Sequence, residues 1–128
     1  MADAERLGKI AMIGQDLITT QLTMAMQTPS QALEGTWVLG YCFGVFDALA
    51  QQADIDDAAE VFSLITLGFL GLFADPADPE GAMFVRRSLD YQDNPRFQEG
   101  AASGGSDVFG WIADRAKAPK ALLEQLNR

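Results

Sequence analysis

The run from Ala58 to Ala74, AAEVFSLITLGFLGLFA, is the feature that most limits how this chain can fold. It contains a single charged residue, so a helix drawn through it is apolar or small on every face. That is typical of a helix enclosed by other elements. Apolar residues recur four apart at Val61, Ile65 and Phe69, and the run is too long for an ordinary strand. We therefore expect a buried central helix over about residues 57–74.

A membrane span is the main alternative for a run this apolar. At about 1.5 Å per residue the run would reach about 25 Å, which is shorter than the roughly 30 Å hydrocarbon core. Its flanks are acidic and carry no nearby Lys or Arg, the usual membrane anchors. We therefore expect a core helix and no membrane partner.

The rest of the chain supplies elements that could enclose this helix. Helical spacing of apolar residues predicts one helix over about 3–27 and a second over about 30–52. A further helix is expected from Pro79, and a short C-terminal pair after residue 106. Residues 92–106 contain GAASGGS and are expected to form a flexible loop. The prediction is an all-α fold, one domain over 1–128, with five to six helices in a compact bundle.

Small residues on the second predicted helix mark the candidate site. Gly40 and Gly44 lie one turn apart and form a groove that ends at Asp47. Glycine in a helix costs about 1 kcal/mol relative to alanine, so we expect something to approach the groove closely. A facing helix, a second copy of the chain and a bound ligand remain alternatives. The candidate residues for a ligand or an interface are Trp37, Gly40, Tyr41, Phe43, Gly44 and Asp47.

Residues 40–49, GYCFGVFDAL, resemble the C-x-G-Y-x-x-G-x-x-D segment of the Rap1a/Tai-type immunity proteins. Those are small helical proteins that bind and block a secreted toxin, so the resemblance implies a protein partner. The match comprises Gly40, Tyr41, Gly44 and Asp47. The chain departs from that family's pattern because its lone cysteine, Cys42, lies inside the motif, whereas the family is periplasmic and disulfide-bonded.

Charge and residue usage argue against several classes of function. The net charge is −9, and no Lys or Arg occurs between Ile10 and Val85. Such a body repels phosphate backbones, so we expect no nucleic-acid partner. The chain has no histidine, which removes the commonest general base and imidazole metal sites. We therefore expect no catalytic residues, no metal and no cofactor, and an enzyme is the less favoured reading.

Two function classes remain. The first is a small acidic protein–protein interaction module that self-associates, for example as a homodimer, or acts like an immunity or adaptor protein. The alternative is a helical domain that binds a small apolar ligand near Gly40, Gly44 and Asp47. The first residues are acidic where a signal peptide is basic, so a cytoplasmic location is expected.

Overall fold

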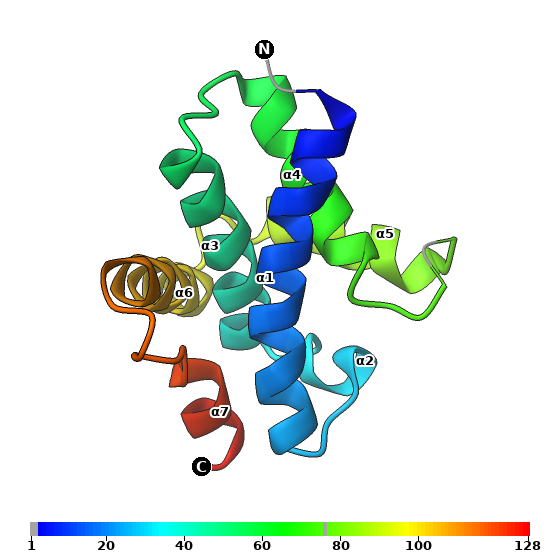
Figure 1. Ribbon diagram of the computed structural model, residues 1–128. Helices are drawn as coiled ribbons and strands as arrows, with labels where there is room; N and C mark the ends of the chain where they lie inside the picture. The colour runs from blue at the N-terminus through cyan, green and yellow to red at the C-terminus, as the bar shows by residue number, and fades with distance from the viewer. Residues whose placement is uncertain (1–2, 76) are drawn as a thin grey trace.

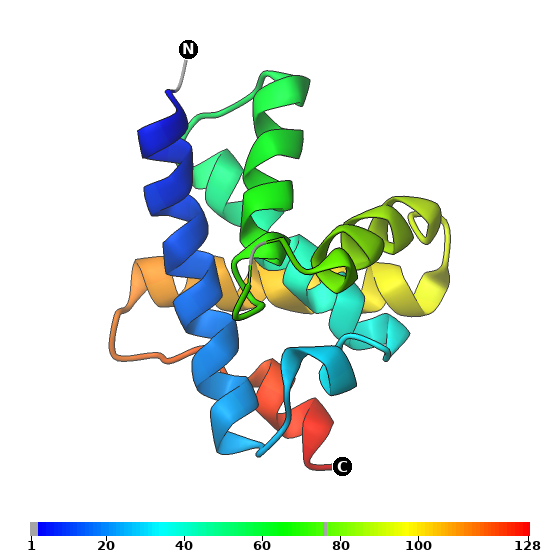
Figure 2. The same ribbon diagram turned by 90° about the vertical axis from the view of Figure 1, so that its right-hand side faces the viewer.

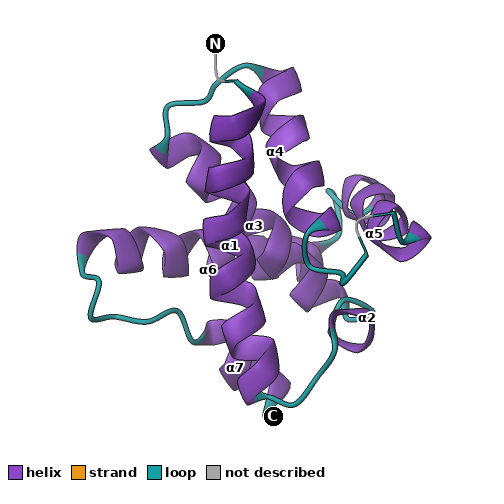
Figure 3. Ribbon diagram, turned by 45° about the vertical axis from the view of Figure 1, so that its right-hand side comes forward, coloured by secondary structure: helices purple, strands orange, loops and turns teal. Residues whose placement is uncertain are grey.

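The computed structural model describes residues 3–75 and 77–128, which form helices and connecting loops with no strand (Figures 1 and 3). The all-α prediction is confirmed. Within the described residues, no helix is both long enough and apolar enough to cross a bilayer. The helices are α1 Ala4–Met24, α2 Pro29–Ala32, α3 Thr36–Gln52, α4 Ala58–Leu70, α5 Pro79–Asp90, α6 Pro95–Ala113 and α7 Ala121–Leu126.

Helix α3 forms the centre of the fold. Twelve of its residues are buried, against four in α4, so α3 is the more enclosed of the two. Helix α4 forms within the predicted range but ends at Leu70, and it exposes one face through Phe62 and Leu67, which are 46% and 39% exposed. The expectation that the 57–74 helix is the enclosed one is therefore corrected. The apolar run specifies a helix, whereas its burial depends on which helices reach each of its faces.

Helix α1 lies alongside α4, as Figure 2 shows, and also contacts α3 and α7. Its buried stripe includes Leu7, Ala11 and Ile18. The Gln15 side chain reaches across to α4, where its Nε2 donates to the Leu67 carbonyl oxygen at 3.0 Å. The amphipathic N-terminal segment thus forms a helix whose apolar face packs against the core.

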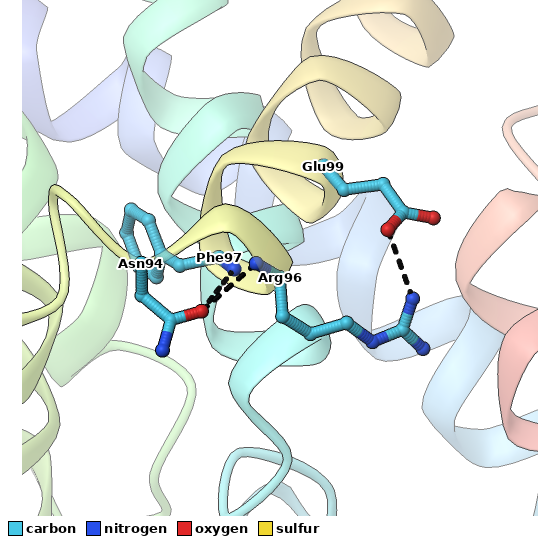
Figure 4. Close-up of polar contacts among 4 residues, drawn as sticks. All are labelled: Asn94, Arg96, Phe97 and Glu99. Carbon is cyan, nitrogen blue, oxygen red and sulfur yellow. Dashed lines mark hydrogen bonds and ion pairs between the residues drawn. The ribbon is translucent and has the colours of Figure 1, made fainter.

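The prediction of a flexible loop over residues 92–106 is wrong from residue 95 onward, because residues 95–106 belong to α6. Figure 4 shows how the helix begins. The side-chain oxygen of Asn94 accepts hydrogen bonds from the backbone N–H groups of Arg96 at 2.8 Å and Phe97 at 3.2 Å. Pro95 occupies the first helical position, where its missing N–H costs nothing. Arg96 also forms an ion pair at 3.1 Å with Glu99, which lies one turn further along the helix.

Candidate functional site

Helix α6 packs directly against the glycine face of α3. A Cβ placed on any of four glycines, two in each helix, would lie closer than 3.0 Å to a backbone carbonyl oxygen of the facing helix. Only glycine allows this approach of two backbones. The glycine and carbonyl pairs are Gly40 with Phe97, Gly44 with Ala101, Gly100 with Trp37 and Gly104 with Tyr41.

The groove predicted at Gly40 and Gly44 is therefore filled by a helix of the same chain. The facing pair, Gly100 and Gly104, has the same spacing of four residues. That shared spacing is the signal that could have identified α6, because small residues four apart lie on one helix face. The glycines that give this segment the composition of a flexible loop are instead required for close packing of the two helices.

The predicted site residues do not form one cluster. Trp37 and Tyr41 stack one turn apart, with ring centroids separated by 5.5 Å. Phe43 packs instead against Phe97 of α6, with a centroid separation of 5.5 Å and tilted rings. Asp47 is partly exposed and accepts a hydrogen bond from Gln51 Nε2 at 3.0 Å. Tyr41 is the member of the set that belongs to a buried polar site.

Three polar side chains from three helices meet beside the core. The Tyr41 hydroxyl donates to Asp107 Oδ2 of α6 at 2.7 Å and accepts from Gln21 Nε2 of α1 at 2.9 Å. Tyr41 is fully buried and Gln21 is 2% exposed. Burial raises the pKa of the Tyr41 phenol far above its ordinary value, and the Asp107 carboxylate raises it further, while the bond from Gln21 acts in the opposite direction. The phenol is therefore a neutral donor.

The same cluster holds the C-terminal helix in place. Asp107 Oδ2 accepts the Ala121 N–H at 3.0 Å, and Gln21 Oε1 accepts the Leu123 N–H at 3.0 Å. Both N–H groups lie in the first turn of α7, and the N-cap residue of this helix, Lys120, supplies no side-chain hydrogen bond. The body of the protein therefore caps a helix that cannot cap itself.

We call Gln21, Tyr41 and Asp107 the α7 seat. The side chain of Leu122 is fully buried beside it, so apolar burial accompanies the two backbone hydrogen bonds. Gln21 and Asp107 were missed as site residues from the sequence. Aspartate is a common helix-capping residue. Asp107 caps α7, through Ala121 14 residues further along the chain, rather than the helix to which it belongs.

Two hollows flank the C-terminal end of α6. The first, an apolar groove of about 180 Å³, lies between α1, the end of α3 and α6. The second, of about 670 Å³, is an open space between α6 and the segment that connects it to α7. Trp111 lines both hollows. The groove, which we call the α1/α6 groove, is lined by Ile10, Ile13, Leu49, Gln52, Ala53, Trp111, Ile112 and Arg115.

Side chains suited to metal binding or nucleophilic chemistry are not gathered in the described part of the chain. No group of three or more Cys, Asp or Glu residues is placed to hold a metal ion within residues 3–75 and 77–128. Cys42 is fully buried, and burial raises the pKa of its thiol. A thiol that stays protonated is a poor nucleophile, so Cys42 acts as a packing residue.

Comparisons of the chain with protein families, with curated proteins and with solved structures give no match. The resemblance of residues 40–49 to immunity proteins therefore stays a prediction.

Proposed function

We propose that this protein is a protein–protein interaction module whose partner is a second copy of the same chain. The α1/α6 groove carries this proposal, because it is an apolar hollow at the surface next to an exposed aliphatic side chain. Ile13, at its edge, is 41% exposed. Single exposed apolar residues are common, whereas apolar residues gathered around a surface hollow are typical of a contact surface.

The size of the groove favours a protein side chain over a small molecule. Its volume of about 180 Å³ is below the roughly 300–1,000 Å³ of pockets that enclose drug-sized ligands. A hollow of this size suits a single large side chain of a partner, the way a buried anchor fills a pocket at an interface. Ile13 and Trp111 are large apolar side chains that line the groove, so each of two copies offers both an anchor side chain and a groove.

The alternative, a small apolar ligand near Gly40 and Gly44, lacks a supporting observation. The backbone of α6 lies within contact distance of both glycines, so the space that a ligand would need is filled. The candidate interface therefore lies at the C-terminal end of α6, where the groove opens, and not at the glycine face of α3.

Size-exclusion chromatography with light scattering across a wide concentration range tests the proposal. We expect a concentration-dependent rise in mass that Ile13→Glu abolishes, because a charged side chain loses its hydration when a partner covers the groove. Met12→Glu is the matched control, since Met12 is more exposed, at 59%, and lies outside the groove lining. A protein that stays monomeric throughout, or equal effects of the two substitutions, would contradict the proposal.

A further inference from the structure

We propose that two copies of the chain associate by exchanging α7, so that each α7 binds the seat of the other copy. This inference rests on the proposed self-association and names the segment that the second copy contributes. It follows from three features: how the seat recognises α7, how the connecting segment is held, and where that segment begins.

The seat recognises features that any copy of the chain provides. Asp107 and Gln21 accept hydrogen bonds from the backbone of residues 121 and 123, and Leu122 fills the apolar position between them. An α7 from a second copy would make the same three contacts. Exchange therefore replaces each native contact with an identical one, which is why terminal segments can be swapped at low cost.

The connecting segment, residues 114–120, is held mainly by itself. Residues 113–118 are exposed. Its local hydrogen bonds run from the Ala116 N–H to the Asp114 carboxylate at 3.0 Å and from the Lys117 N–H to the Asp114 carbonyl at 2.9 Å. Beneath the segment lies the open space of about 670 Å³ described above. Straightening this segment would therefore cost few contacts with the body.

At its start, the segment contacts α6 through Asp114, whose N–H donates to the Gly110 carbonyl oxygen at 3.0 Å, and through Arg115. The guanidinium carbon of Arg115 lies 4.0 Å from the centroid of the Trp111 ring. Trp111 also lines the α1/α6 groove, so the segment departs from the edge of the proposed contact surface. An α7 that crosses to another copy would bring that copy towards the groove, and exchange and groove contact would act in one interface.

Shortening the connection tests the exchange. Deleting residues 116–118 leaves Arg115 and Pro119 in place and reduces the maximum reach of the seven-residue connection from about 23 Å to about 13 Å. The shorter connection should hinder the return of α7 to its own seat, whereas it leaves α7 free to dock on the seat of a second copy. We expect light scattering to show a dimer at concentrations where the unaltered chain is mostly monomeric, with at least a tenfold lower apparent Kd.

The matched control keeps the length and changes the sequence, as Ala116→Gly, Lys117→Ser and Ala118→Gly, and should associate like the unaltered chain. Adding Leu122→Asp to the shortened chain should return it to a monomer, because the exchanged α7 loses its buried side chain. A shortened chain that remains monomeric would overturn the inference.

Adding Ile13→Glu to the shortened chain separates the two proposals. A dimer that resists Leu122→Asp but dissociates with Ile13→Glu would leave the groove proposal standing and overturn the exchange. A dimer that dissociates with Leu122→Asp and survives Ile13→Glu would support exchange and place the anchor of the interface at the seat rather than at the groove.

Discussion

Replacing Gly44 with alanine should destabilise the protein, although alanine is the better helix former. The new Cβ would lie closer than 3.0 Å to the Ala101 carbonyl oxygen of α6. Because the obstacle is backbone, no side-chain rotation can relieve the overlap, and α3 and α6 must move apart.

Two opposing effects set the size of the change. Removing a helical glycine stabilises by about 1 kcal/mol, while overpacking a core costs about 1–3 kcal/mol or more. We expect the overlap to prevail, because separating the helices also disturbs the other three glycine contacts of the crossing. The net loss should be about 1–2 kcal/mol for Gly44→Ala and larger for Gly44→Leu.

Gly110→Ala provides the matched control in α6, since a Cβ there meets nothing within 4 Å. It should leave stability unchanged or raise it by up to about 1 kcal/mol. Urea denaturation followed by circular dichroism measures both variants, and the difference between them should be about 1–3 kcal/mol. Equal stability of Gly44→Ala and Gly110→Ala would refute the reasoning, because it would mean that the two helix backbones do not meet at Gly44.

Two further predictions concern the buried titratable groups. Tyr41→Phe should cost about 1–2 kcal/mol, because Gln21 loses a buried partner. Since burial raises the pKa of Tyr41, the phenol stays protonated in the fold while the unfolded chain ionises near pH 10, so stability should fall as the pH rises above about 10. Urea melts between pH 8 and pH 11 should show a weaker fall for Tyr41→Phe, and equal slopes would contradict the assignment. Cys42 should react with a thiol reagent only as fast as the protein unfolds, since its thiol is buried and its raised pKa keeps it protonated; rapid labelling in native buffer would place it at the surface.

Local chemistry determined where several helices begin. Asp57 caps α4 by accepting from the N–H groups of Ala59 and Glu60 at 2.8 and 3.2 Å. Asp78 does the same for α5, ahead of Pro79 at the first helical position. These signals depend on neighbours within one turn, so they can be read from the sequence.

The glycine-rich part of α6 could not be read in this way. In isolation, GAASGGS has the composition of a flexible linker, and no local contact stabilises it as a helix. Its helical state depends on Gly100 and Gly104 packing against the Trp37 and Tyr41 carbonyls of α3, which lie some sixty residues earlier in the chain. A pattern of small residues therefore indicates close helix packing only when the facing helix is known.

Tertiary structure alone decided which helix is central and which polar groups form a site. The apolar run of α4 specified a helix, but the enclosure fell to α3, because α6 could approach its glycine face closely. Gln21, Tyr41 and Asp107 come from three helices, and the hydrogen bonds that join them connect residues 20 and 66 positions apart in the chain. Periodicity records which face of a helix is buried, whereas the local sequence does not record which distant segment that face will contact.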